Sequence, residues 1–387
     1  MKIAIVVQGR FHAFDLAKAL SARGHDVTVF TNYPLFATRR FGLPDAQVRS
    51  FPVHGVLSRA VDYVPARPLK AWWEPVGHRM FGRWAARELA RERWDVIHCW
   101  SGVSEEILRS GSAGNALTLL MRGSSHVVTQ RRLLDEESAR ASVPLDKPSD
   151  WMVARETREY ALADRINVLS SFCWRSFEDE GMAPNRLALL PLGVDIEAFR
   201  PSADAEARRR RRIRAGEPLR VLYVGLLSFR KGLLDLAHVV ERLPGDRFHF
   251  TLVGQQMPET VDLVASLASR VEVLGKLPQA HLPSAYATAD VFLFPTIEDG
   301  FPVVLAQAKA AGLPIITTPN GAGTDLVQPD RDGWIVPIRD VEAIVERLQW
   351  CDANRDALVG IIDARGRFPS RSWADVASDF ERICIGA

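Results

Sequence analysis

Short apolar runs that alternate with helical stretches constrain the fold of this chain more than any other feature of its sequence. The first run, Lys2 to Val7, is almost wholly aliphatic after its lysine. A polar loop and a stretch with helical spacing follow, and a second apolar run begins at Val27. A strand without polar alternation is typical of a parallel sheet that is covered on both faces. The pattern therefore predicts a doubly wound α/β domain.

The same alternation recurs in two series that are separated by a break. Further strands are expected at residues 95–98, 116–121 and 165–169, and in the second series at 220–224, 248–253, 271–274, 291–294, 314–317 and 334–336. The rhythm stops near 189–195, and a stretch with little apolar content follows. A chain of 387 residues exceeds the size at which one core usually keeps growing.

Two doubly wound, Rossmann-like domains that face each other across a cleft are therefore expected, and the ligand should bind at the carboxyl ends of their strands. The expected boundaries are an N-terminal acceptor-binding domain over 1–195, a linker over 196–217 and a C-terminal donor-binding domain over 218–369. The linker contains five consecutive arginines, Arg208 to Arg212, which favour an exposed, solvated helix.

Composition and charge exclude several classes of protein. With 47% apolar and 25% charged residues and a net charge of +2, the chain is an ordinary globular protein without the strong basic character of a nucleic-acid binder. The first apolar run is too short for a secretory signal or a membrane span, so a cytoplasmic location is expected. The cysteines have neither metal-ligand spacing nor a disulfide framework, and they are Cys99, Cys173, Cys351 and Cys384.

Two adjacent cations stand where a helix is expected to begin in the second half. The strand 220–224 is followed by Gly225, and Arg230 and Lys231 then precede the helix expected over 232–243. A helix N-terminus offers unpaired N–H groups and the positive end of its dipole, and two cations there can neutralise a diphosphate. The alternative is a surface loop with two solvated charges.

A second constellation follows the strand 291–294. Glu298, Asp299 and Gly300 form a turn, and Gln307 lies further along the helix that follows. Amides of this turn could hold phosphate or sugar oxygens, the acids could bind sugar hydroxyls, and Gln307 could meet a ribose. The alternative is a capped helix start at which the acids are favourable to the helix dipole.

In their order and spacing, these motifs resemble the C-terminal half of the family 4 retaining glycosyltransferases, which have the GT-B architecture. The matching segments are 191–195, 230–232, 289–295, 298–301, 311–317 and 332–337. The resemblance extends over roughly 190 residues and is looser in the N-terminal half. It also implies that a last helix, within 370–387, crosses back onto the first domain.

The resemblance implies specific roles for these residues. Lys231, helped by Arg230, would contact the donor diphosphate and stabilise the leaving phosphate, a role that needs a cation and no metal. Asp299 would face the donor sugar, and Gln307 would take the place of the acid that binds the ribose. The expected donor-binding set is Gly9, Gly225, Arg230, Lys231, Glu298, Asp299, Gly300, Phe301, Pro302, Val303 and Gln307.

Three departures from the family pattern bear on activity. Gln307 stands where the family has a glutamate, which keeps an acceptor oxygen but loses the charge. Leu226 stands where many members have an arginine, and Pro302 replaces a common glycine and thereby removes one N–H group near the sugar.

The N-terminal half contributes weaker candidates. Gly9 follows the first strand and could let a ligand approach the backbone. No Gly-x-Gly-x-x-Gly follows that strand, which argues against a nicotinamide-dependent dehydrogenase. The family usually places a histidine near the reacting sugar, after a strand that corresponds to 116–121, and here both Arg122 and His126 are candidates. His98 is expected to pack in the core, and His12 is an outside candidate.

Residues 65–94 mix tryptophans with arginines and lysines. This mixture favours a helix that packs on the first sheet with a basic outer face, and the alternative is a weak peripheral contact with the inner face of a membrane.

The expected reaction is transfer of a hexose-type sugar from a UDP- or GDP-sugar, UDP before GDP, to a glycan or lipid-linked acceptor. Configuration would be retained, with no metal and no cofactor besides the nucleotide sugar. The expected catalytic residues are Lys231, Arg230, Asp299, His126 and Arg122. The alternatives are a nucleotide-sugar epimerase of the same fold and a non-catalytic partner subunit that binds nucleotide.

Overall fold

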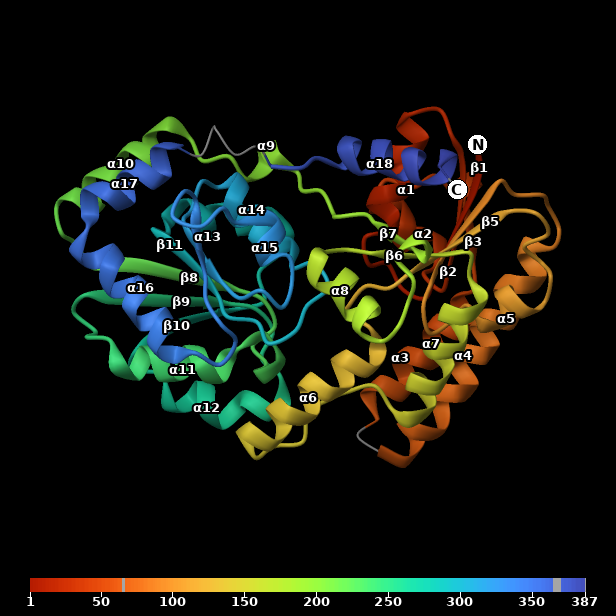
Figure 1. Cartoon of the computed structure of the whole chain (residues 1–387), viewed down its shortest axis with the longest axis horizontal. Helices are drawn as coiled ribbons and strands as arrows, with labels where there is room; N and C mark the ends of the chain where they lie inside the picture. Colours follow the sequence, from red (N-terminus) through yellow and green to blue (C-terminus); the bar gives the residue numbers. More distant parts are fainter. Residues whose placement is uncertain (65–66, 365–369, 387) are drawn as a thin grey trace.

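The computed structural model describes residues 1–64, 67–364 and 370–386. Two α/β domains lie side by side (Figure 1), and each is built on one sheet whose strands are all parallel. The strand order is β3-β2-β1-β4-β5-β6-β7 in the first sheet and β10-β9-β8-β11-β12-β13 in the second. The predicted fold of two doubly wound domains is confirmed.

The N-terminal domain contains seven strands among the described residues, which are β1 (Lys2–Val7), β2 (Asp26–Thr31), β3 (Val48–Ser50), β4 (Val96–Trp100), β5 (Leu117–Met121), β6 (Arg165–Val168) and β7 (Leu187–Leu189). Its helices are α1 (Ala13–Ala22), α2 (Leu35–Arg39), α3 (Pro52–Tyr63), α4 (Arg67–Leu89), α5 (Glu105–Arg109), α6 (Val127–Ala141), α7 (Asp150–Leu162) and α8 (Ser171–Asp179).

The strands of the C-terminal domain are β8 (Leu219–Val224), β9 (Phe248–Val253), β10 (Val271–Gly275), β11 (Val291–Phe294), β12 (Ile315–Thr317) and β13 (Gly333–Ile335). The helices around them are α11 (Leu233–Arg242), α12 (Val261–Ser266), α13 (Leu282–Thr288), α14 (Val303–Ala310), α15 (Gly323–Leu326), α16 (Val341–Ala353) and α17 (Arg355–Asp363), and a one-turn 3-10 helix, η3 (Phe229–Lys231), precedes α11.

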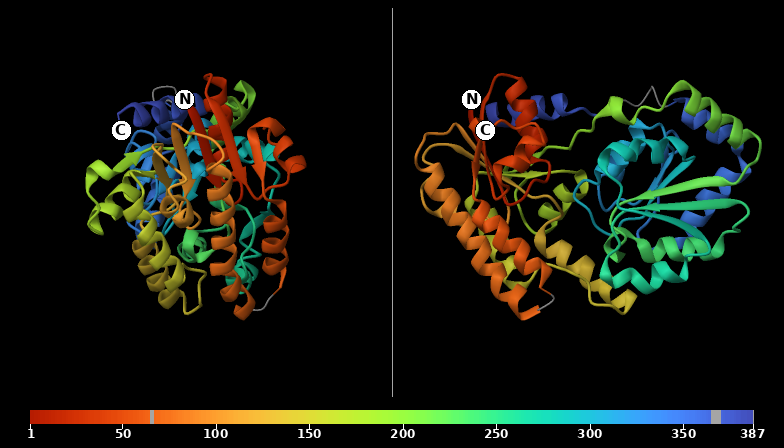
Figure 2. Two further views of the ribbon diagram at one scale, coloured as in Figure 1. Left: turned by 90° about the vertical axis from the view of Figure 1, so that its right-hand side faces the viewer. Right: turned by 180° about the vertical axis from the view of Figure 1, so that it is seen from behind.

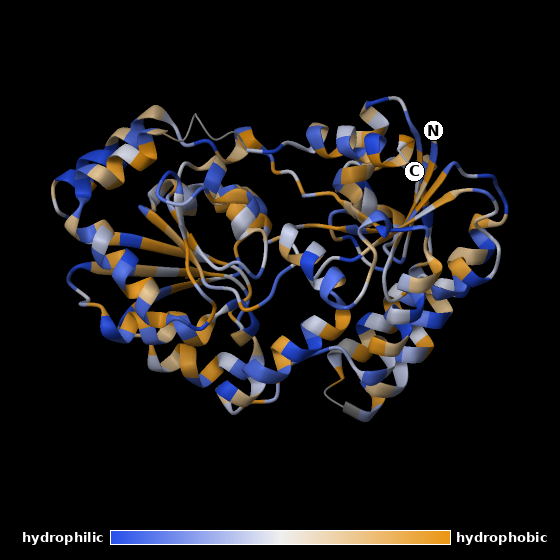
Figure 3. Ribbon diagram, in the orientation of Figure 1, coloured by the Kyte–Doolittle hydropathy of each residue, from blue (hydrophilic) through white to orange (hydrophobic). Residues whose placement is uncertain are grey.

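Apolar burial explains why the chain adopts these sheets. Every residue from Ile3 to Val7 is fully buried, and β1 pairs with β2 on one side and with β4 on the other. Apolar residues gather in the strands of both sheets, whereas polar residues gather on the outer faces of the helices (Figure 3). The central strands therefore have no solvated face, as their unbroken apolar sequence predicts.

Two edge strands were not predicted, β3 and β7. Each has only three residues, which is too short for an apolar run to be recognised against its surroundings.

The segment expected to be the linker, 196–217, is mostly helical and belongs to the C-terminal domain. Its helices are α9 (Ile196–Phe199), which packs on α13 and α14, and α10 (Ala203–Arg214), which packs on α13 and α17. The chain therefore crosses between the domains earlier, at residues 190–195.

The arginine run in α10 is not the fully solvated surface that its composition predicts. Arg209 is 1% exposed, and its guanidinium donates hydrogen bonds to the carbonyl oxygens of Tyr286 (2.9 Å) and Ala311 (3.1 Å). Arg212 forms an ion pair with the buried Asp290 at 2.5 Å. Within a run of identical residues no periodicity separates the buried positions from the exposed ones, so the sequence could not identify Arg209.

The chain crosses between the domains a second time just before α18 (Trp373–Ile385). The amide of Val194 donates to the carbonyl of Arg371 at 2.9 Å, so the two crossings lie side by side. From there α18 packs on α1 of the N-terminal domain, where Glu381 binds Arg23 (2.6 Å) and His25 (2.7 Å). Figure 2 shows α18 on the N-terminal domain from behind as well.

At the opposite end of the interface α6 reaches the C-terminal domain, as Figures 1 and 2 both show. Arg339 binds Glu136 and Glu137 of α6, each at 2.9 Å, and Arg140 of α6 forms an ion pair with Asp235 at the start of α11. Glu137 and Asp235 are fully buried. Ion pairs between two fully buried acids and partly exposed arginines thus join the domains far from the chain crossings.

The basic and aromatic segment forms α4, and Pro65 and Ala66 lie outside the described residues. Phe81, Ala85 and Leu89 are fully buried against the sheet, whereas Trp72, nearer the start of the helix, is 59% exposed. The predicted packed helix is present in its C-terminal part. In the described part of the chain, no helix combines the length and apolar character that a membrane crossing requires.

We expect Arg209→Met to lower the free energy of unfolding by about 3 kcal/mol, because buried carbonyl oxygens lose their donor while the apolar stem is preserved. Urea unfolding followed by far-UV circular dichroism measures the change. Arg208→Met is the matched control, since Arg208 is exposed, and it should stay within about 0.5 kcal/mol of the wild type. Equal effects of the two substitutions would contradict the assignment of Arg209 as a buried clamp.

Candidate active site

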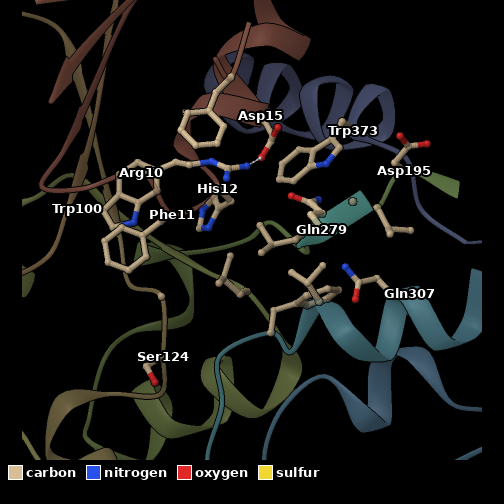
Figure 4. Close-up of a pocket in the computed structure, with 18 of the residues that line it drawn as sticks. Arg10, Phe11, His12, Asp15, Trp100, Ser124, Asp195, Gln279, Gln307 and Trp373 are labelled. Atoms are coloured by element: carbon tan, nitrogen blue, oxygen red, sulfur yellow. Dashed lines mark hydrogen bonds and ion pairs between the residues drawn. The ribbon is translucent and has the colours of Figure 1, made fainter. Parts of the chain in front are cut away.

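A cleft of about 1350 Å³ lies between the two domains (Figure 4). The N-terminal domain contributes the loop after β1 and the ends of β4 and β5, and the C-terminal domain contributes η3 and α14. These segments follow or adjoin the carboxyl ends of parallel strands, where open α/β sheets bind ligands. The start of α18 completes the cleft through Trp373.

The predicted cation pair stands at this cleft. Arg230 lines it directly, and Lys231 lies behind Arg230 with only 9% of its surface exposed. Both belong to η3, which ends at Gly232 with φ +78°, and α11 begins at the next residue. A side chain at Gly232 would collide with the carbonyl oxygen of Pro295, because an ideal Cβ would lie 1.9 Å from it. Glycine is therefore required where the cations meet the acidic turn.

Lys231 is held in place by the acidic turn. Its Nζ donates to Asp299 Oδ2 at 2.6 Å and to the carbonyl oxygen of Glu298 at 3.0 Å. Burial lowers the pKa of Lys231, and the carboxylate of Asp299 opposes that shift by favouring the charged form. The side chain is fixed by these contacts.

Glu298 is the centre of the contact between the domains. Its carboxylate is fully buried and accepts hydrogen bonds from the hydroxyls of Ser124 (2.6 Å) and Ser125 (2.8 Å) and from the Ser125 amide (3.1 Å). Arg230 of its own domain forms an ion pair with it at 2.7 Å. Burial would raise the pKa of Glu298, but the charges of Arg230 and Lys231 and the donors of the N-terminal domain outweigh burial and hold it far below its ordinary value.

The structure places Glu298 outside the cleft lining. The sequence predicts that it binds the donor, but its oxygens are occupied by protein donors and it does not line the cleft. It instead positions Arg230, whose Nη2 also donates to Ser124 at 3.0 Å. Family resemblance distinguished Asp299 as the acid that faces the sugar, but the burial of Glu298 is defined by the opposite domain and leaves no local signal in the sequence.

Gly300 is where the two backbones approach each other most closely in this region. An ideal Cβ at Gly300 would lie 2.2 Å from the carbonyl oxygen of Gly123, so only glycine allows the contact. Asp299 is partly exposed and donates its amide to the carbonyl of Asn320 at 3.0 Å. Phe301 and Val303 line the cleft, while the buried Pro302 is the N-cap residue of α14.

Gln307 lies in α14 and lines the cleft (Figure 4). Its Oε1 accepts a hydrogen bond from the hydroxyl of the buried Tyr286 at 3.0 Å. The position suits contact with a bound ligand, and the tyrosine fixes the orientation of the amide.

Neither of the two predicted glycines, Gly9 and Gly225, lines the cleft. Gly9 has φ +108° and donates its amide to Asn32 Oδ1 at 2.8 Å, while its neighbours Gln8 and Arg10 line the cleft. The amide of Gly225 donates to the carbonyl of Val253 at 2.9 Å, and Gly225 is not among the residues that line the cleft.

The structure distinguishes the two candidates that follow β5. Arg122 lines the cleft and binds Gln130 Oε1 (2.6 Å) and Glu156 (3.1 Å). His126 is buried as the N-cap of α6, where Nδ1 accepts from the amide of Val128 and the ring packs on Tyr160. Burial lowers its pKa to about 4. His126 thus caps α6 outside the cleft lining, and its role near the reacting sugar stays a prediction.

Of the other histidines, His12 lines the cleft and packs against Trp100, with 5.0 Å between ring centroids and an angle of 46° between the ring planes. Burial lowers the pKa of His12 to about 4, so it is neutral at pH 7. His98 is fully buried in the core, as expected. Within residues 1–64, 67–364 and 370–386, no group of three histidine, cysteine or acidic side chains is arranged to hold a metal ion.

Several residues of the cleft were not predicted, and they are Arg10, Phe11, Lys18, Arg40, Trp100, Gln279 and Trp373. Arg10 and Phe11 follow the first strand, a position that could have identified them. Gln279 and Trp373 belong to segments that the fold alone brings to the cleft, so the sequence contains no local signal for them.

Comparison with known proteins was consistent with this geometry. The profile described as Glycosyltransferase Family 4 matches residues 10–198, and the one described as Glycosyl transferases group 1 matches residues 218–354. The D-inositol 3-phosphate glycosyltransferase of Acidothermus cellulolyticus is 31% identical over 349 residues, which cover 84% of this chain and 73% of that protein.

Two further relatives match over a smaller share of their length. The putative colanic acid biosynthesis glycosyltransferase WcaL of Salmonella typhimurium is 28% identical over 62% of this chain and 60% of its own. The GDP-mannose-dependent alpha-(1-6)-phosphatidylinositol monomannoside mannosyltransferase of Mycobacterium tuberculosis is 28% identical over 54% of this chain and 58% of its own.

Solved structures share the fold. The sucrose-phosphate synthase of Thermosynechococcus elongatus superposes with a TM-score of 0.75 at 22% identity, covering 100% of this chain and 98% of that one. HepE of Anabaena, in complex with UDP, gives 0.69 at 14% identity and covers both chains fully. Fold and cleft thus define a GT-B glycosyltransferase. The chain belongs to glycosyltransferase family 4.

We expect Glu298→Gln to lower the free energy of unfolding by about 3 kcal/mol at pH 7, because Arg230 is left without its buried carboxylate. Folding lowers the pKa of Glu298. Its carboxylate therefore contributes to the free energy of unfolding above the ordinary pKa of about 4.3, and this contribution is lost as the pH falls below that value. The difference in the free energy of unfolding between the wild type and Glu298→Gln should be constant above pH ~5.5. Below pH ~4 it should decrease by about 1.4 kcal/mol per pH unit.

Urea unfolding at a series of pH values measures this difference. Glu178→Gln, at an exposed position, is the matched control and should show no such dependence. A difference that does not narrow in acid would mean that Glu298 is not held as a buried anion.

Proposed function

We propose that this protein transfers a hexose-type sugar from a UDP- or GDP-sugar to a glycan or lipid-linked acceptor with retention of configuration. The observation that carries the proposal is the pair Arg230 and Lys231, fixed by two carboxylates at the edge of a cleft between the domains. The transfer needs no metal and no cofactor besides the nucleotide sugar, because these cations would neutralise the leaving diphosphate.

The chemistry of the pair suits a diphosphate. Arg230 presents a planar fork that can bind phosphate oxygens in pairs, and Lys231 supplies a compact charge next to it. Both cations are already bound to carboxylates and therefore need little reorganisation when charge develops on the leaving group. Arg122 and Asp299 complete the candidate catalytic set at this edge, and Gln307 is positioned to meet the ribose.

The relatives and structural neighbours support the classes of donor and acceptor. HepE of Anabaena has been solved with UDP and with UDP-glucose, and the M. tuberculosis relative is named GDP-mannose-dependent. We propose both nucleotides as donor carriers, with UDP before GDP. Relatives named for colanic acid and phosphatidylinositol mannoside synthesis support a glycan or lipid-linked acceptor.

A lipid-linked acceptor would fit a cytoplasmic protein that touches the inner face of a membrane weakly. Exposed apolar side chains on α3 and α4 support such a contact, including Val56 (68% exposed), Tyr63 (87%) and Trp72 (59%).

A thermal-shift panel with UDP, GDP, ADP, TDP and CMP tests the donor site without knowledge of the acceptor. A ligand at 100 times its Kd should stabilise the protein by about 2.7 kcal/mol. A selective rise in Tm with UDP or GDP supports the proposal, and no rise with any nucleotide would overturn it. Product analysis then separates the alternatives, because an epimerase converts the donor without an acceptor and a partner subunit binds nucleotide without consuming the donor.

Lys231→Ala should lower kcat for sugar transfer by about 10²- to 10³-fold, because a preorganised charge at the leaving phosphate is removed. Lys70→Ala, at an exposed position on α4, is the control for loss of one positive charge. Circular dichroism establishes that each variant is folded. Turnover that is unchanged in Lys231→Ala would exclude this residue as the phosphate ligand.

Gln307→Glu should tighten UDP binding by about fivefold, because a carboxylate accepts stronger hydrogen bonds from ribose hydroxyls than an amide does. Isothermal titration calorimetry gives the Kd of both proteins. Weaker or unaltered binding would show that the side chain at this position does not meet the ribose.

A further inference from the structure

A second group of cations lies on the N-terminal side of the cleft, apart from Arg230 and Lys231. Its members are Arg10, Lys18 and Arg40, and we call them the N-terminal cation group. Figure 4 shows Arg10 with Asp15 on the wall formed by the N-terminal domain, away from Ser124, the residue that binds Arg230. The pair Arg230 and Lys231 and the N-terminal cation group therefore lie at different parts of one cleft.

The three cations converge on a short segment that follows α2. The guanidinium of Arg10 lies over the ring of Phe41, 4.0 Å from its centroid. Lys18 lies along the next residue, since an ideal Cβ at Gly42 would be 3.6 Å from its Cδ. Arg40 directly precedes Phe41. The guanidinium of Arg40 lies over the ring of Phe36, 5.9 Å from its centroid, so the cations have different supports but line the same cleft.

The N-terminal cation group carries more positive charge than the carboxylates that face it can neutralise. Asp15 is shared between Arg10 (3.4 Å) and Lys18 (2.9 Å), and among the described residues Arg40 has no carboxylate oxygen within 4 Å. The other acids that line the cleft have partners elsewhere: Asp195 caps α9 through the amide of Ala198 (3.2 Å), and Glu197 pairs with Arg200 (3.0 Å). A surplus of positive charge therefore faces the cleft.

An aromatic residue of the cleft lining, Phe11, directly follows Arg10 in the sequence. Phe11 is 67% exposed although it lines the cleft, and its φ of +42° is unfavourable for a bulky residue. Strain of this kind persists where the surrounding structure imposes it, often at binding sites. An exposed ring beside cations can pack on the apolar face of a sugar while its charged substituent meets the cations.

We propose that the N-terminal cation group binds a phosphate group on the acceptor, with Phe11 packed against the sugar that carries it. The inference rests on the proposed function and names the acceptor class for the same cleft. A phosphate monoester carries about 1.5 to 2 negative charges at pH 7 and three acceptor oxygens. A phosphate monoester therefore balances the surplus positive charge of the N-terminal cation group better than a single carboxylate does. The planar guanidinium groups also suit the geometry of its oxygens.

The test uses thermal shifts of the full chain in the presence of saturating UDP. The UDP shift is measured first and by itself, so a failure of the proposed function is seen separately. Glucose 6-phosphate, glucuronate and glucose are then titrated at equal ionic strength. We expect a rise in Tm with glucose 6-phosphate, a smaller one with glucuronate and none with glucose.

The variants are Arg40→Ala and Lys18→Ala, both at exposed positions that can be changed without disturbing the core. Each should raise the half-saturating concentration of glucose 6-phosphate about tenfold and leave the UDP shift intact. Arg39→Ala is the matched control, because Arg39 is adjacent and exposed but pairs with Asp45 outside the cleft. It should bind glucose 6-phosphate like the wild type.

Three results would overturn the proposal. The first is a glucose 6-phosphate response that is unchanged in Arg40→Ala and Lys18→Ala, or absent altogether. The second is an equal response to glucuronate, which would make the group a general anion site. The third is a response that UDP abolishes, which would assign the cations to the donor.

The phosphate could be on a soluble sugar or on a lipid, and a second arm distinguishes these sources. Sedimentation with phosphatidylcholine vesicles, with and without phosphatidic acid, is compared for the wild type and Arg40→Ala. Binding that requires both phosphatidic acid and Arg40 assigns the phosphate to a lipid. A glucose 6-phosphate response without such vesicle binding assigns it to a soluble acceptor.

Discussion

One buried carboxylate holds the donor side of this protein together. Glu298 belongs to the C-terminal domain, but most of its neutral hydrogen-bond donors belong to the N-terminal domain, and its counter-charge is Arg230. Removing a charge from water is costly unless it is paired and fully hydrogen bonded, so the carboxylate is stable only when both domains surround it. The position of Arg230 and the contact between the domains therefore both depend on the carboxylate of Glu298.

The cleft consequently has two groups of cations that differ in how many carboxylates bind them. Arg230 and Lys231 are bound to carboxylates of their own domain and are rigid before any ligand arrives. On the N-terminal wall, Arg10 and Lys18 share the carboxylate of Asp15, and Arg40 faces the cleft without a carboxylate partner among the described residues. Rigid charges suit the stabilisation of a leaving group, whereas partly solvated charges suit the binding of an exchanging ligand.

The sequence predicted the fold and the motifs that lie within one segment, and it failed where residues far away in the sequence determine burial. Unbroken apolar runs defined β1, β8 and β11, and the motif around Arg230 and Asp299 identified the family. The burial of Glu298 depends on Ser124 and Ser125, which lie far away in the sequence. The burial of Arg209 depends on carbonyl oxygens of the domain's other elements. No periodicity within one segment can contain that information.

The side-by-side chain crossings have a mechanical consequence. Val194 is bonded to Arg371, and an ideal Cβ at Gly193 would lie 2.5 Å from the carbonyl carbon of Ser372, so the two connections form one narrow pivot. A body attached along one line can only swing about it. Asp195 and Trp373, close to the pivot, would travel little in such a swing, whereas Arg140 and Asp235, at the far end of the interface, would travel most. The ion pairs of α6 therefore lie where a swing about the pivot would separate the domains most.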